Sequence, residues 1–203
     1  MIKITVPATS ANLGIGYDTL GMAVSLYSHF TFERADKLTI TGCPEEFQNE
    51  DNLVYVSFVD ALAAWGEPAF PVAIDIQTDV PVARGLGSSS TCVVAGIMAA
   101  AALTGHTVDR AELVRIATEV EGHPDNVAPA ILGGAVCSFT PTDSLPQCLR
   151  YEVSDRLSFY YRDSALRGTH ERGAQGRAAG DSALHRRVAN GPHRRYDARL
   201  GDW

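Results

Sequence analysis

The sequence predicts an α+β domain in its first 159 residues, and two kinds of pattern predict it. Residues 2–6 and 72–78 alternate apolar and polar side chains, which is the period of a half-buried strand. Residues 52–65 and 109–120 instead place apolar side chains at helical spacing. Strands and helices in one stretch of chain favour the α+β class.

Residues that end strands or cap helices separate the predicted elements. Pro7 is expected to end the first strand, and residues 37–41 are expected to pair with residues 24–33 across a turn. Asp51 or Asn52 caps the first helix, and Asp109 caps the third. The strands are expected at 2–6, 24–33, 37–41, 72–78, 134–139, 149–153 and 157–159, and the helices at 52–65, 92–103 and 109–120.

After residue 159 the composition changes. Residues 160–203 contain no Ile, Phe, Met or Cys, and Leu and Val together number 4 of 44. This is too little apolar material for a packed core, so the segment is expected to be a poorly structured Arg/Gly-rich tail. It could be a basic tail that binds a polyanion, or the product of a wrong reading frame in a GC-rich gene. The absence of lysine and the abrupt change favour the second interpretation.

Charge and cysteine usage restrict the classes of function. Residues 1–159 carry 8 Lys and Arg against 19 Asp and Glu, which disfavours nucleic acid as a partner of this part. Four cysteines form no C-x-x-C pair and are expected to be free thiols in a reducing compartment. We find no signal peptide and no apolar run long enough to span a bilayer, so the sequence favours a cytoplasmic protein without membrane contact.

The most informative stretch is a glycine loop that leads into an apolar helix. Gly85 and Gly87 permit tight turns and a close approach to a ligand, and Ser88, Ser89 and Ser90 can cap the helix. The first amides of a helix lack internal partners and lie at the positive end of its dipole, so a phosphate is the expected guest. The loop matches neither G-x-x-x-x-G-K-[ST] nor G-x-G-x-x-G. By itself it could also be an ordinary capped helix start.

Two polar clusters accompany this loop. Residues 8–23 are rich in small residues and include Asn12 and Asp18, which could bind a polar ligand or could bond within the turn. Residues 119–134 hold two carboxylates, a histidine and the pair Asp125-Asn126. That pair could instead cap a helix starting at Val127.

Taken together, three segments resemble the GHMP kinases, and among these they look most like homoserine kinases. The segments are PATSANLGIGYDTLG at 7–21, PVARGLGSSS at 81–90 and EGHPDNVAPAILGG at 121–134. The glycine-serine segment fits the whole superfamily, whereas the other two segments narrow the resemblance to homoserine kinases. It covers residues 1–159 and implies a domain of the ribosomal protein S5 domain 2 type, a mixed sheet backed by helices.

The resemblance also implies a reaction and a set of site residues. The reaction is transfer of the ATP γ-phosphate to L-homoserine in threonine biosynthesis, with Mg²⁺ as cofactor. Ser88 and Glu121 would hold the metal, with Glu119 as the alternative to Glu121. Asn12, Asp18 and His123 would line the substrate pocket, and Asp125 and Asn126 would be catalytic, although a loose transition state needs no strong base. The ATP phosphates would be held by Pro81, Val82, Ala83, Arg84, Gly85, Leu86, Gly87, Ser88, Ser89, Ser90 and Thr91.

The sequence departs from this family in its second half. Homoserine kinases carry a second, ferredoxin-like domain with another glycine-rich motif and with arginines for the substrate carboxylate, and residues 160–203 match neither. The resemblance therefore implies an exposed apolar face and little or no activity for the chain as given. Two alternatives stay open: another GHMP small-molecule kinase, and a non-catalytic ATP-binding domain. The sequence also allows a homodimer.

Overall fold

The computed structural model describes residues 1–203 except 142–143, 155, 158, 164–183 and 189–203. The strands are β1 Ile2–Ala11, β2 Leu20–Arg34, β3 Thr39–Thr41, β4 Val72–Thr78, β5 Ala135–Phe139, β6 Gln147–Tyr151, β7 Phe159–Asp163 and β8 Leu184–Val188. The helices are the 3₁₀ turn η1 Glu45–Phe47, α1 Leu53–Ala64, α2 Ser88–Thr104, α3 Arg110–Glu121 and α4 Pro124–Leu132.

One long strand, β2, organises the main sheet. β1 runs antiparallel along one side of β2, from Ile2 opposite Phe32 to Ala11 opposite Gly21. The other side of β2 is shared, because β4 pairs with its second half and β5 with its first residues. The order is β3-β4-β2-β5-β6, with β1 added beside β2, so the sheet mixes parallel and antiparallel pairs.

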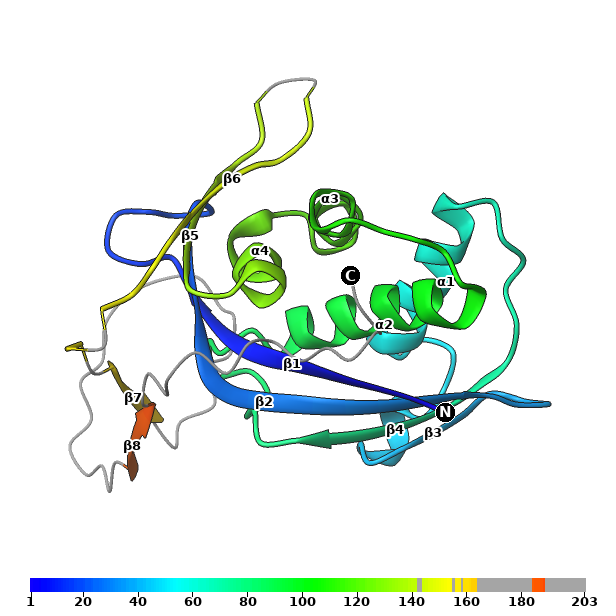
Figure 1. The fold of residues 1–203 in the computed structure, drawn as a ribbon. Coiled ribbons are helices and arrows are strands. Elements are labelled where there is room, and N and C mark those ends of the chain that lie inside the picture. The colour runs from blue at the N-terminus through cyan, green and yellow to red at the C-terminus, as the bar shows by residue number, and fades with distance from the viewer. Residues whose placement is uncertain (142–143, 155, 158, 164–183, 189–203) are drawn as a thin grey trace.

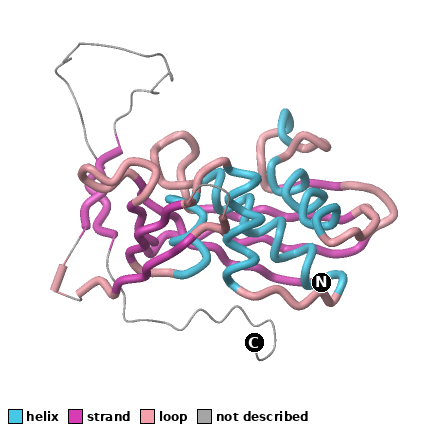
Figure 2. The backbone as a smooth tube through the Cα atoms, turned by 90° about the horizontal axis from the view of Figure 1, so that it is seen from above, coloured by secondary structure: helices cyan, strands magenta, loops and turns pink. Residues whose placement is uncertain are grey.

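The four α-helices cover one face of this sheet (Figure 1). Figure 2 shows the same layers from above, with the helices lying across the strands. The core lies between the two layers, where Phe30, Phe32, Phe58, Leu62 and Ile97 are all buried. The α+β class and the sheet backed by helices, both expected from the sequence, are confirmed.

Local capping signals predicted the starts of α1 and α3 and the end of α2. Asn52 caps α1 by accepting a hydrogen bond from the Val54 amide, and Asp109 caps α3 by accepting one from the Glu112 amide. Gly105 ends α2 in the left-handed conformation. Each signal depends on a few neighbouring residues, so a sequence pattern contains all of it.

Two strand predictions were wrong. Pro7 does not end β1, because β1 lies at the edge of the sheet and its register shifts between Pro7 and Ala8. An edge strand with such an irregularity tolerates the missing amide of proline. Residues 39–41 pair with β4 in parallel rather than with β2, because β4 already occupies that side of β2.

The segment expected to be a tail contributes most of β7 and all of β8. β8 pairs antiparallel with β7, with Phe159 opposite Val188 and Asp163 opposite Leu184. The prediction that residues 164–183 and 189–203 lack regular structure falls outside the described residues. Among the described helices, none is long and apolar enough to cross a membrane.

Candidate active site

The glycine loop leads into a helix start that no side chain caps. Gly87 is the N-cap of α2, with φ of 61° and ψ of 35°, and α2 begins at Ser88. The three serines therefore lie inside the first turn, and the prediction that they cap the helix was wrong. The first turn of α2 also contains no acidic residue. Its amides and the positive end of its dipole are thus left to an anion.

A carboxylate from another helix lies against this first turn. Glu121, the last residue of α3, accepts hydrogen bonds from Ser89 Oγ at 2.8 Å and from Ser90 Oγ at 3.1 Å. Ser88 makes no such contact with Glu121 among the described hydrogen bonds. Glu119 instead points to solvent and pairs with Arg115 at 2.7 Å. Of the two acidic candidates, only Glu121 lies beside the glycine loop.

The half-buried thiol of Cys92, on α2, is also influenced by Glu121. Burial, with a smaller contribution from the negative charge of Glu121, raises the pKa of Cys92 to about 11, although a hydrogen bond with Thr91 acts in the opposite direction. The dipole of a helix N-terminus commonly lowers the pKa of a thiol. Here desolvation outweighs it, so Cys92 is an inert part of the packing behind the site. All four cysteines are free, as the sequence predicted.

The start of α4 forms the second wall of the site. His123 is the N-cap of α4, and its Nδ1 lies 2.5 Å from Asp125 Oδ1. Asp125 is fully buried, and its Oδ2 has no hydrogen-bond partner among the described residues. A buried carboxylate is costly unless it is paired, so the contact with His123 accounts for one oxygen and leaves the other to a ligand or water.

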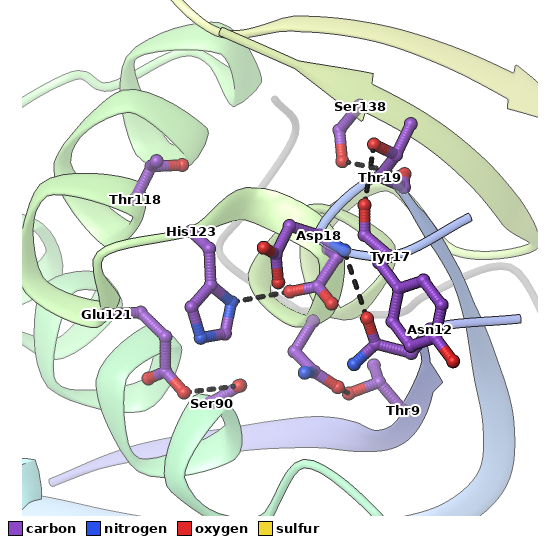
Figure 3. Close-up of polar contacts among 12 residues, drawn as sticks. Thr9, Asn12, Tyr17, Asp18, Thr19, Ser90, Thr118, Glu121, His123 and Ser138 are labelled. Atoms are coloured by element: carbon purple, nitrogen blue, oxygen red, sulfur yellow. Dashed lines mark hydrogen bonds and ion pairs between the residues drawn. The ribbon is translucent and has the colours of Figure 1, made fainter. Parts of the chain in front are cut away.

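The third wall is the loop between β1 and β2. Asn12 and Asp18 both have positive φ, 57° and 52°, and Asn12 Oδ1 accepts a hydrogen bond from the Asp18 amide at 3.0 Å. This confirms that Asn12 bonds within the turn, which was one of the two interpretations. The side chains of Asn12 and Asp18 are exposed, and Figure 3 shows them across from His123, Glu121 and Ser90.

A glycine holds the second and third walls together. A Cβ on Gly21 would lie 1.8 Å from the Asp125 carbonyl oxygen and 3.0 Å from Pro129 Cγ. Any side chain at residue 21 would therefore push α4 away from β2. The position of Asp125 and Asn126 over the sheet depends on this close approach, so Gly21 is a structural requirement of the site.

Most of these residues were expected in the site from the sequence, and one residue was not. The structure brings together the start of α2, Glu121, His123, Asp125, Asn126, Asn12 and Asp18. Val82, one of the residues expected to hold the phosphates, has a side chain that is 72% exposed. Thr9 was not expected in the site, yet it is fully buried and its Oγ1 donates to Asn126 Oδ1 at 2.8 Å. Its place within the 7–21 segment was the only sequence signal.

The donor set fits a hard cation that is shared with a phosphate. No group of three or more His, Cys, Asp or Glu side chains gathers among the described residues, so a metal held wholly by such ligands has no place there. Mg²⁺ commonly uses one or two carboxylates, with water and phosphate oxygens as its other ligands. Glu121 and the serine hydroxyls beside it supply oxygen atoms of that kind.

Comparison with known proteins gives a consistent result. Residues 52–134 match the family described as GHMP kinases N terminal domain. A homoserine kinase of Clostridium botulinum is 47% identical over 160 residues, which are 78% of this chain and 54% of that protein. A homoserine kinase of Clostridium beijerinckii is 51% identical over 138 residues, which are 67% of this chain and 46% of that protein. The chain spans about half the length of the curated relatives it matches.

Solved structures show the same relationship. The crystal structure of homoserine kinase from Cytophaga hutchinsonii matches with a TM-score of 0.64 and 30% identity, over 81% of this chain and 56% of that one. Mevalonate kinase of Methanococcus jannaschii shares the fold, with a TM-score of 0.61 at 15% identity over 78% and 60% of the two chains. Residues 52–134 therefore belong to the GHMP kinase family, and the chain is similar to homoserine kinases over about half of their length.

Proposed function

We propose that the site described here transfers the γ-phosphate of ATP to the hydroxyl of L-homoserine, which gives O-phospho-L-homoserine. One observation carries the proposal: Glu121 lies against the uncapped first turn of α2, directly beside the start of α4 with His123, Asp125 and Asn126. An anion-binding helix start and a polar acceptor wall are the two halves that phosphoryl transfer needs. The homoserine kinases similar to this chain supply the identity of the acceptor.

The phosphate half depends on backbone groups. The loop from Pro81 to Gly87 places a left-handed residue directly before α2, so the amides of Ser88, Ser89 and Ser90 are free of side-chain caps. Donors fixed in this way need no rearrangement as negative charge develops on the transferred group. The hydroxyls of Ser89 and Ser90 donate to Glu121, so they orient its carboxylate at the edge of the phosphate site.

Magnesium is part of this proposal. Glu121, with the hydroxyls of the first turn of α2 including Ser88, would hold it. When bound, the ion would neutralise negative charge on the phosphates. The hydrogen bonds of Glu121 with Ser89 and Ser90 support this role of its carboxylate.

The acceptor half is polar and carries negative charge, which suits an amino acid. Asp18 is an exposed carboxylate that can accept from the ammonium group of L-homoserine, and Asn12 fixes the turn that presents it. Asn126 can donate to an oxygen of the acceptor or of the phosphate. Asp125 is buried and paired with His123, so it holds the histidine in position, and its Oδ2 has no partner among the described residues. Positioning, rather than a strong base, is the main contribution of these residues.

Two other functions fit parts of the same site. Another small alcohol could replace L-homoserine, because the fold is shared with mevalonate kinase. A non-catalytic ATP-binding domain is the second alternative, since the chain spans about half the length of its relatives. A cytoplasmic location, a homodimer and a domain boundary at residue 159 belong to the proposal as well.

The experiment that tests the proposal follows product by ³¹P NMR. The purified chain is incubated with Mg·ATP and, in separate samples, L-homoserine, L-serine, L-threonine or mevalonate. We expect only a weak phosphoester signal, which forms first in the L-homoserine sample, because residues 160–203 match no second substrate-binding domain and the sequence therefore predicts little activity. A faster signal with another alcohol would identify that alcohol as the substrate. ATP binding without any phosphoester would favour the non-catalytic ATP-binding domain.

A pair of variants links the result to the proposed site. Asp18→Asn should raise the KM for L-homoserine about tenfold or more, because one charge-assisted contact with the ammonium is lost. Its KM for ATP should stay unchanged. Asp75→Asn is the matched control, because Asp75 is a carboxylate of β4 that bonds Thr41, outside the three walls of the site. Equal effects of the two variants would contradict the role of Asp18.

A further inference from the structure

One buried hydroxyl contacts both halves of the site. Thr9 lies on β1, is fully buried and donates from Oγ1 to Asn126 Oδ1, which is 117 residues away in the chain. Its backbone amide donates to the Leu86 carbonyl oxygen at 3.1 Å. Thr9 therefore bonds the glycine loop through its backbone and the acceptor wall through its side chain.

The glycine loop is shaped around this hydroxyl. A Cβ on Gly87 would lie 2.1 Å from Thr9 Oγ1 and 3.1 Å from Asn126 Oδ1. The N-cap of α2, the threonine hydroxyl and the asparagine carboxamide thus meet at one point without room for an additional methyl group. Such tight packing fixes the rotamer of Thr9 and with it the direction in which the hydroxyl donates.

The contact determines which end of Asn126 is left for a ligand. A carboxamide has an acceptor end and a donor end, and Thr9 occupies the acceptor end. Among the described residues no group accepts a hydrogen bond from Asn126 Nδ2. Asn126 is only half-buried, so the two N–H donors can reach a bound molecule. Without the hydroxyl of Thr9 the carboxamide could rotate and present its oxygen to a phosphate, which would repel it.

We propose that Thr9 is a positioning residue that fixes the carboxamide of Asn126 with its NH₂ group toward the oxygen atoms between which phosphate is transferred. The inference rests on the proposed function, because it is a phosphoryl-transfer site that needs a donor there. Thr9 touches no reacting atom itself. Its role is to make one orientation of Asn126 permanent and to keep that orientation in register with the glycine loop.

The test uses side-chain amide signals of the ¹⁵N-labelled chain. Asn126→Ala identifies the NH₂ pair of Asn126 by its disappearance. Thr9→Val removes the hydroxyl at nearly constant volume, and Thr9→Ser restores it. Ser57→Ala is the matched control, because Ser57 is also fully buried and donates to a helix carbonyl, that of Leu53 on α1.

We expect the NH₂ pair of Asn126 to shift by more than a linewidth in Thr9→Val and to return toward its wild-type position in Thr9→Ser. Ser57→Ala should leave it unchanged. If Thr9→Val is folded by its amide spectrum and the Asn126 pair keeps its wild-type position, the proposal is overturned. A shift as large in Thr9→Ser as in Thr9→Val would overturn it too, because the hydroxyl would then not be the cause.

A titration separates this inference from the proposed function. Mg²⁺ with a non-hydrolysable ATP analogue and L-homoserine should shift both the backbone amides of residues 81–91 and the Asn126 pair in the wild-type chain. In Thr9→Val the loop response should persist while the Asn126 response falls to about half or less, because the carboxamide then divides between two orientations. A loop response without any Asn126 response in the wild type would refute the donor role. No response at all would refute the proposed nucleotide site, whereas the spectra without ligand would still decide whether Thr9 fixes Asn126.

Discussion

Helices α2 and α3 begin in opposite ways, although they lie in the same layer. Asp109 closes the start of α3, because its carboxylate accepts a hydrogen bond from the Glu112 amide at 2.8 Å. Gly87 leaves the start of α2 open, with no side-chain cap and no acidic residue in the first turn. The first arrangement stabilises a helix, and the second forgoes that stabilisation in favour of a ligand.

The difference teaches that helix starts must be compared by what satisfies their amides. A sequence with three serines at a helix start looks better capped than one with a single aspartate. In the structure the serines lie one position too late to cap, and two of them turn toward Glu121. The carboxylate beside the start of α2 comes from another helix, and it accepts hydrogen bonds from the serine hydroxyls.

The largest expected effect comes from adding a side chain to Gly87, at the uncapped start of α2. Gly87→Ala places a side chain at φ of 61° and within 2.1 Å of Thr9 Oγ1. We expect a loss of about 2–5 kcal/mol in the free energy of unfolding, from left-handed strain together with overpacking. Binding of ATP should also weaken, because the loop and Thr9 must move apart. Chemical denaturation and calorimetric titration measure the two effects.

The control for this variant lies at the other end of the same helix. Gly105→Ala has φ of 75° with nothing within 4 Å of the added Cβ, so only the strain of about 1–2 kcal/mol remains. Its ATP affinity should equal that of the wild type. If both variants lose the same stability and the same affinity, the crowding at Gly87 is not a feature of the site.

The next effect comes from removing the charge that faces the open start. Glu121→Gln should weaken binding of Mg·ATP by about tenfold or more, since a carboxylate ligand of the metal is lost. Binding of metal-free ATP should instead stay equal or improve, because a negative charge beside the phosphates is gone. Titrations with Mg²⁺ and with EDTA distinguish these directions. Glu119 forms an exposed ion pair with Arg115, so Glu119→Gln should change neither the affinity for Mg·ATP nor that for metal-free ATP.

The local part of this architecture could be predicted from the sequence. The bounds of β4 at Val72–Thr78, the end of α2 at Gly105 and the cap of α3 at Asp109 all depend on residues within one or two turns of each other. Glu121 could be chosen over Glu119 only by resemblance, because both lie near the end of α3. The structure distinguishes them by the direction of their side chains, which sequence spacing leaves open.

The remaining part depends on contacts between distant residues. β3 pairs with β4 rather than with β2, a choice that depends on which strand reaches the free side of β2. The hydrogen bond from Thr9 to Asn126 and the approach of Asp125 to Gly21 each join segments more than 100 residues apart. Packing of the whole domain determines these contacts, so a single sequence does not display them.

The smallest expected effect concerns Asp109, which caps the start of α3. Asp109→Ala should lower the free energy of unfolding by about 1 kcal/mol, because the Glu112 amide loses its partner. Affinity for Mg·ATP should not change, since the amides at α3 are not part of the phosphate site. Asp109→Asn keeps the acceptor oxygen and should recover most of the stability, which isolates the hydrogen bond from the charge. If Asp109→Ala weakened ATP binding as much as Gly87→Ala, the two helix starts would not be functionally distinct. The open start would then have to be explained by stability alone.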